Sequence, residues 1–142
     1  MQIRNFTADD YTEAYALWEK TPGMNLGSLN NTYAGIKSVI DHNPALCFAA
    51  INDDGAIIGT ILGGTDGRKG YLYHTAIADG YRGQHIGSTL IHKVLDELKA
   101  QGIEKIGLFT TNENVKGREF WEHLGFKQRT DITYLDIDLD LI

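Results

Sequence analysis

Hydrophobic residues recur at helical spacing in four parts of the chain. Tyr11, Ala14, Tyr15 and Trp18 share one face of a first predicted helix, which Thr7 caps with Asp10 at its third position and which ends at Thr21-Pro22-Gly23. Ser28 is expected to cap a second helix running to about Asn43. The pattern from Ile86 to Leu98 predicts a long amphipathic helix with a left-handed cap at Gly102, and a last helix is predicted from Val115 to Leu124.

Apolar and β-branched runs between these helices predict strands. The predicted strands cover residues 3–6, 45–52, 56–63, 70–78, 103–110, 126–129 and 132–139. The turn Asp53-Asp54-Gly55 joins two of them into an antiparallel hairpin. In the last strand Leu135, Ile137 and Leu139 alternate with aspartates, which gives one buried face and one charged face. The order βααβββαβαββ therefore predicts an α+β fold with a mixed sheet.

Composition narrows the possible functions. The 142 residues, without repeat or linker, predict a single domain over residues 1–142. The longest apolar stretch, Ala45 to Ile51, is too short to cross a bilayer and no signal segment opens the chain, so we expect a cytoplasmic protein with no membrane partner. A lone cysteine, Cys47, and scattered histidines predict no metal site. The net charge of −6 disfavours nucleic acid and favours a cationic small molecule or peptide.

Glycines cluster in the turn that precedes the long helix, Ala78-Asp79-Gly80-Tyr81-Arg82-Gly83-Gln84-His85-Ile86-Gly87-Ser88. The first amides of a helix have no partner inside the helix, and together with the helix dipole they form an anion site for which phosphate is the natural ligand. The spacing matches neither a P-loop nor a dinucleotide-binding turn. A turn that merely starts the helix is the alternative.

Two motifs in this sequence resemble a known family. The run Arg82-Gly83-Gln84-His85-Ile86-Gly87 after the strand Tyr73-His74-Thr75-Ala76-Ile77 resembles the pyrophosphate motif of the GNAT superfamily of N-acetyltransferases. Thr110 to Asn114 followed by Phe120-Trp121-Glu122-His123-Leu124-Gly125-Phe126 is similar to the family's later acetyl-CoA motif. The resemblance implies a mostly antiparallel, twisted sheet of six or seven strands with about four helices, splayed between strands four and five.

The resemblance also implies which residues hold the co-substrate acetyl-CoA. The backbone of Ala76, Ile77 and Ala78 would pair with the pantetheine arm, and amides from Gln84 to Ser88, within the turn that includes Arg82 and Gly83, would hold the pyrophosphate. Asn114 would bind the pantetheine amides, and the helix with Phe120 and Trp121 would cover the thioester. Two residues depart from the family pattern: His85 stands at the motif's first glycine, and Trp121 stands where a tyrosine often protonates the leaving thiolate.

Acetyl transfer to an amine needs a group that removes the ammonium proton, because the charged form has no lone pair. His74 on the thioester-bearing strand is the candidate base, and Tyr73, which strand alternation places on the opposite face, is the weaker candidate. A histidine that only completes the hydrogen bonding of the sheet is the alternative. A backbone N–H near Ala76 would meet the oxyanion. Met24, Asn25 and Leu26 border the acceptor site in the resembled family.

The function expected from these residues is transfer of an acetyl group from acetyl-CoA to a primary amine by direct attack in a ternary complex. Two alternatives are a CoA-binding sensor module without catalysis, which His85 and Trp121 motivate, and a transferase that uses a longer acyl-CoA. The acceptor is a small-molecule or peptide amine whose identity the residues leave open. The oligomeric state is open as well, a homodimer included.

Overall fold

The computed structural model describes residues 1–27 and 29–142. Five strands and four α-helices follow one another in this part of the chain: β1 (Gln2–Asn5), α1 (Tyr11–Glu19), α2 (Tyr33–His42), β2 (Cys47–Ile51), β3 (Ile57–Thr65), β4 (Gly70–Ile77), α3 (Ile86–Ala100), β5 (Ile106–Gly107) and α4 (Val115–His123). Short 3-10 turns cover Ala8–Asp10 and Leu139–Leu141. The expected mixed α+β fold is confirmed.

The strands form a single sheet in the order β1-β2-β3-β4-β5. Neighbouring strands are antiparallel except β4 and β5, which run parallel. The sheet thus has five strands in the described residues, fewer than the six or seven that the family resemblance implied. The β2–β3 hairpin is as predicted: the side-chain oxygen of Asn52 accepts hydrogen bonds from the amides of Asp54 and Ala56, and Gly55 takes a positive φ of 83°.

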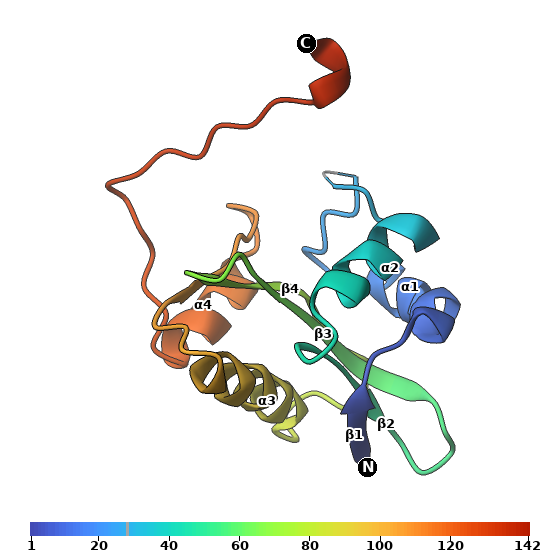
Figure 1. Cartoon of the computed structure of the whole chain (residues 1–142). Helices are drawn as coiled ribbons and strands as arrows, with labels where there is room; N and C mark the ends of the chain where they lie inside the picture. The colour runs from blue at the N-terminus through green and yellow to red at the C-terminus, as the bar shows by residue number, and fades with distance from the viewer. Residues whose placement is uncertain (28) are drawn as a thin grey trace.

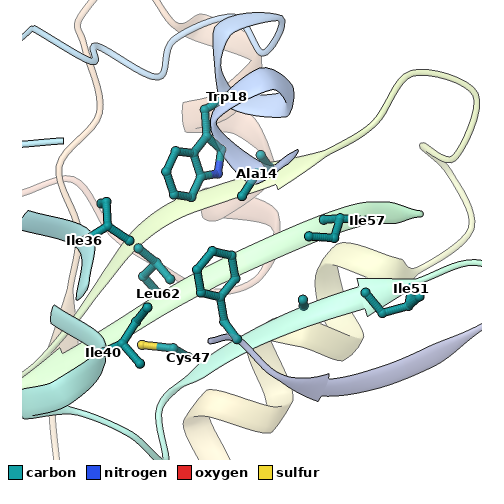
Figure 2. Packing of buried hydrophobic residues seen from close by; sticks show 11 residues of the cluster. Ala14, Trp18, Ile36, Ile40, Cys47, Ile51, Ile57 and Leu62 are labelled. Atoms are coloured by element: carbon teal, nitrogen blue, oxygen red, sulfur yellow. The ribbon is translucent and has the colours of Figure 1, made fainter. Parts of the chain in front are cut away.

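Helices cover both faces of the sheet (Figure 1). On one face α1 and α2 enclose a core cluster, which Figure 2 shows with Trp18, Ile36, Ile40 and Leu62 converging above the strands. On the other face the apolar stripe of α3 packs against a second cluster that includes Leu46, Ile58, Ile61, Leu90 and Val94. Alternate residues of β2 and β3 enter the two clusters, which explains why both strands read as nearly continuous apolar runs.

The second helix begins later than predicted. Its N-cap is Thr32, whose hydroxyl accepts a hydrogen bond from the amide of Gly35, and the expected cap Ser28 lies outside the described residues. The side chain of Asn31 explains the difference, because its amide nitrogen donates to the carbonyl oxygens of Leu26 and Leu29. These bonds hold Leu26 and Leu29 in a conformation other than a helix that leads into α2.

The strands predicted near the C-terminus are also wrong in part. The strand expected over residues 103–110 is reduced to β5, because Ile103 belongs to the helix stop: its amide donates to the carbonyl of Leu98, beside Gly102 at φ 83°. The segments 126–129 and 132–139 are not strands. From residue 127 to residue 140 no backbone hydrogen bond reaches another described segment, so the predicted strands have no pairing strand in the described part of the chain.

Gly63 tests how closely β3 packs against α3. A Cβ at this position would lie 2.7 Å from Cγ1 of Val94 and 2.8 Å from the carbonyl oxygen of Leu46. We expect Gly63→Ala to lower the free energy of unfolding by about 1–3 kcal/mol, because the buried backbone has no room to shift. Urea denaturation measures this, with Gly27→Ala as the control, since no atom lies within 4 Å of a Cβ there. Equal stability of the two variants would contradict the packing described.

Candidate functional site

An irregularity in β4 places the histidine singled out in the sequence. The pairing of β3 with β4 shifts between Thr60 and Leu62, opposite His74, and His74 adopts a positive φ of 48°. Such a bulge breaks the alternation of side chains. Tyr73 packs against the core under α1 and α2, and the ring of His74 contacts Trp18 in the same layer. The prediction that Tyr73 and His74 lie on opposite faces is therefore wrong.

A buried chain of hydrogen bonds holds the backbone of His74. The indole N–H of Trp18 donates to the hydroxyl of Thr60 at 2.9 Å, and this hydroxyl donates to the carbonyl oxygen of His74 at 2.8 Å. Trp18 and Thr60 are both 0% exposed. The ring of Trp18 also meets the imidazole nearly edge-on, with 4.5 Å between centroids. A non-glycine residue keeps a positive φ only where its surroundings fix it, and these contacts do so.

Asn31 determines which nitrogen of His74 carries the hydrogen. Because the amide nitrogen of Asn31 donates to two loop carbonyls, its oxygen is the atom that faces Nε2 of His74, at 2.8 Å. An oxygen acceptor requires a hydrogen on Nε2, which leaves Nδ1 of the neutral ring unprotonated. Nδ1 is buried and has no hydrogen-bond partner in the described part of the chain. The ring thus keeps one lone pair that no group in the described residues uses.

Burial also sets the charge of this ring. Desolvation lowers the pKa of His74 from 6.5 to about 4. The imidazole is therefore neutral at physiological pH, and Nδ1 is able to accept a proton without first losing one. The same low pKa makes it a weak base in the closed fold.

β4 and β5 part after Tyr71, before β4 reaches His74. They pair only at Gly70↔Ile106 and Tyr71↔Gly107, whereas β4 continues to Ile77. The amide of Ala78 donates to the carbonyl oxygen of Ile58 on the β3 side. Backbone groups alternate along a strand, so the amide of Ile77 faces the opposite side, where β5 no longer runs. The expected splay between the fourth and fifth strands is present.

The glycine-rich turn leads from β4 into α3 and leaves its amides unpaired. The backbone N–H groups of residues 84–88 find no acceptor among residues 1–27 and 29–142. His85, the N-cap, takes a positive φ of 63°, which explains why glycine is favoured at this position and how a histidine can stand there. Exposed amides at the start of a helix of 15 residues form a site for an anion.

Side chains of the turn stabilise it from within. Arg82 forms an ion pair with Asp79 at 2.9 Å, and the side chain of Gln84 donates to the carbonyl oxygen of Gly80. The hydroxyls of Ser88 and Thr89 both donate to the carbonyl oxygen of His85. These side chains are thus occupied with the turn, and the backbone amides remain for a ligand.

The later motif lies beside this turn. A Cβ on Gly87 would lie 3.5 Å from the ring of Phe120, so α4 packs against the first turn of α3. Trp121 packs between Phe120 and Phe126 and belongs to the core under α3. Asn114 is the N-cap of α4, and its oxygen accepts a hydrogen bond from the amide of Gly117 at 3.0 Å. The structure brings the two sequence motifs together.

The predicted acceptor loop approaches the same region. A Cβ on Gly23 would overlap the side chain of Asn114, so the loop after α1 touches the start of α4. Met24 and Leu26 pack against the core under α1 and α2, and Asn25 has a positive φ of 50°. A surface cavity of about 390 Å³ lies between α1 and the turn, lined by Leu17, Lys20, Ile77, Ala78, Asp79 and Arg82 among others. It reaches the turn but not His74.

The described residues offer neither a metal site nor a reactive cysteine. None of the His, Cys, Asp and Glu side chains described forms a cluster of three able to hold a metal ion. Cys47 is buried, which raises the pKa of its thiol to about 11 and makes it unsuited to nucleophilic chemistry. Residues 1–27 and 29–142 contain no helix long and apolar enough to span a bilayer.

Three residues that support the site were missed in the sequence. The three residues that act on His74 through the contacts above are Asn31, Thr60 and Trp18. The sequence pattern singled out only Trp18, and only as a core residue, so its role toward His74 was missed as well. No local signal marks Thr60 or Asn31, because both are defined by partners 14 and 43 positions away.

Comparison with known proteins agrees with these motifs. The sequence profile of the acetyltransferase (GNAT) family matches residues 4–126. An acetyltransferase of Sodalis glossinidius is 31% identical over 95% of this chain and 93% of its own, and one of Photorhabdus laumondii is 33% identical over 91% and 88%. A GNAT-family acetyltransferase from Staphylococcus aureus has the same fold, with a TM-score of 0.77, 21% identity and coverage of 96% and 93%.

The low pKa of His74 predicts acid sensitivity. Between pH 6.5 and 4 the imidazole of residue 74 is protonated in the unfolded chain but stays neutral in the folded protein. The free energy of unfolding is therefore highest above pH 6.5 and falls by up to about 3 kcal/mol toward pH 4. We expect His74→Gln to flatten this part of the stability curve, as measured by urea denaturation at a series of pH values. His92→Gln, on the exposed face of α3, is the matched control. An unchanged slope in His74→Gln would refute the burial described.

Proposed function

Because this chain belongs to the acetyltransferase (GNAT) family, we propose that it transfers an acetyl group from acetyl-CoA to a primary amine by direct attack in a ternary complex. The acceptor is a small-molecule or peptide amine. The net charge of −6 suits a cationic acceptor.

One observation carries this proposal: the unpaired amides of residues 84–88 lie directly after the strand from which β5 has parted. A diphosphate held by those amides would place the attached pantetheine arm along Ala76, Ile77 and Ala78, on the open side of β4. Gly87 leaves space for close approach, and Phe120 borders it. Asn114 and Trp121 would then flank the arm from the side of α4.

The reaction forms a C–N bond and breaks a C–S bond. The free amine attacks the thioester carbonyl, and the backbone amide of Ile77, which faces the open side, donates to the oxyanion. The amide of Ala76, the donor expected from the sequence, faces β3 by the same alternation. The nitrogen then loses its proton to Nδ1 of His74, and the sulfur leaves as a thiolate that needs no acid from Trp121. Nδ1 is buried, and the route that we propose for the amine passes between β4 and the loop of Met24, Asn25 and Leu26.

A second candidate is a CoA-binding sensor without catalysis. The specific observation in its favour is that neither ring nitrogen of His74 faces solvent: Nε2 is bonded to Asn31 and Nδ1 is buried. A sensor would still bind CoA at the amides of residues 84–88. Turnover therefore separates the two candidates, whereas binding does not.

Turnover is tested with acetyl-CoA and a panel of primary amines, by following the released thiol. We expect His74→Ala to lower kcat/KM by about 10²- to 10⁴-fold with little change in CoA affinity, because it removes the proton acceptor and no phosphate contact. A plot of kcat/KM of the parent against pH should show no inflection from His74 between pH 5.5 and 8, since the ring is neutral throughout this range. His92→Ala is the control.

A parent rate retained by His74→Ala would refute the assignment of the base. Absence of thiol release with every amine, together with tight CoA binding, would favour the sensor. Parallel assays with propionyl-CoA and succinyl-CoA decide whether a longer acyl group is preferred.

The turn offers a matched pair of variants for CoA binding. Gly87→Val places a branched side chain against Phe120 and Ile77, where the diphosphate would approach, and we expect at least a tenfold loss of affinity by calorimetry. His85→Gly keeps the amides and relieves a positive φ, so affinity should stay within about threefold of the parent. Equal affinities of the two variants would place the diphosphate elsewhere.

A further inference from the structure

Asn31 is buried, and both polar atoms of its side chain are bonded. The residue is 9% exposed. Its amide nitrogen donates to the carbonyl oxygens of Leu26 at 2.6 Å and Leu29 at 3.2 Å, and its oxygen lies 2.8 Å from Nε2 of His74. Because a buried polar group without a partner costs free energy, each of these bonds contributes to the folded state. The two ends of one short side chain thus hold two different parts of the site.

Both helices of this face fix where the side chain of Asn31 lies. From α1, the hydroxyl of Tyr11 donates to the backbone oxygen of Asn31 at 2.7 Å. Asn31 directly precedes Thr32, the N-cap of α2, whose own amide and hydroxyl donate to the side-chain oxygen of Asn30. The position of Asn31 is therefore set by the fold and not by His74. A fixed acceptor of this kind determines how a neighbouring imidazole is oriented and which tautomer it adopts.

The loop does not need the contact between Asn31 and His74. The two bonds of the amide nitrogen already hold Leu26 and Leu29, and they leave the side-chain oxygen free for a different partner. That partner is Nε2 of His74, and in the described part of the chain it is the one hydrogen-bond partner that the imidazole has. Without it, nothing described would distinguish the two ring nitrogens. The effect of Asn31 therefore falls on the opposite side of the ring, where Nδ1 lies buried with its lone pair unused.

The neutral charge of Asn31 matters as much as its position. A carboxylate at the same place would favour the charged ring, in which both nitrogens carry a hydrogen and Nδ1 has no lone pair left. No charged group in the described residues contributes to the pKa of His74, which burial alone lowers. The ring meets the indole of Trp18 from α1, and from β3 the hydroxyl of Thr60 meets its backbone. A neutral amide oxygen thus completes surroundings that keep the imidazole uncharged.

We propose that Asn31 is a positioning residue for acetyl transfer: its side-chain oxygen holds the imidazole of His74 in the tautomer and orientation that keep the lone pair of Nδ1 available for the proton of the amine. Asn31 acts through His74 and does not itself meet the thioester or the amine. In the transfer an N–H bond of the amine breaks, its proton binds the lone pair of Nδ1, and the hydrogen on Nε2 stays in place. This inference rests on the proposed function.

Variants of Asn31 test this role by kinetics. Asn31→Asp should raise the pKa of His74, so the plot of kcat/KM against pH should rise through an inflection between about pH 5.5 and 8, where that of the parent is flat. Asn31→Ala should lower kcat by about 10- to 100-fold, because the imidazole loses its fixed orientation. Tyr11→Phe is the matched control: it removes one bond to the same loop and leaves the side chain of Asn31 in place. Its kcat should stay within about threefold of the parent, with a flat pH profile.

Nitrogen NMR of the parent with isotope-labelled histidine tests the tautomer without turnover. His74→Gln identifies the signals of residue 74, which should show a hydrogen on Nε2 and none on Nδ1 at neutral pH. A hydrogen on Nδ1, a flat pH profile in Asn31→Asp or a parent-like kcat in Asn31→Ala would each overturn the role of Asn31 and leave acetyl transfer intact. Absence of thiol release by the parent would instead refute the proposed function, and with it the role of Asn31 in the reaction.

Discussion

The candidate site depends on the hydrogen-bonded chain from Trp18 through Thr60 to the carbonyl oxygen of His74. This chain fixes a bulge in β4 that would otherwise cost free energy, because His74 has a positive φ. The bulge turns His74 toward α1 and α2 and keeps Tyr73 in the same layer. Replacement of Thr60 by a residue without a hydroxyl would leave the buried indole N–H and the carbonyl oxygen both unpaired, so core packing and site geometry are supported by the same contacts.

Backbone strain outside glycine occurs on three separate segments. Among the described residues other than glycine, positive φ occurs at Asn25, His74 and His85. Asn25 belongs to the predicted acceptor loop, His74 to the bulge and His85 to the turn before α3. Strained residues persist where a geometry is needed that relaxed backbone does not supply. We propose that these three residues meet the acceptor, the thioester and the diphosphate, respectively. Their shared backbone strain supports the site independently of any single distance.

Local signals predicted the elements whose causes are local. The periodicity of α1 and α3, the stop at Gly102 and the turn at Gly55 depend on neighbouring residues, and the structure has them where expected. The errors arise where distant partners decide. The start of α2 follows from bonds of Asn31, and the bulge at His74 follows from pairing with β3. The tail has a strand pattern, but residues 127–140 make no backbone hydrogen bond to another described segment, so the pattern alone did not produce a strand. The unpaired amides of residues 84–88 were predictable from the sequence because the start of any helix leaves backbone N–H groups without partners.

Asn31 connects the predicted acceptor loop to the imidazole through one side chain. Its amide nitrogen holds the carbonyls of Leu26 and Leu29, its backbone oxygen accepts the hydroxyl of Tyr11, and its side-chain oxygen fixes the hydrogen on Nε2 of His74. An acceptor that displaces the loop would therefore also release Nε2 and admit solvent to a ring whose low pKa arises from burial. Entry of the amine would thus raise the basicity of His74, the residue that we propose as the base. By linkage, a charged His74 would favour the open loop to the same extent.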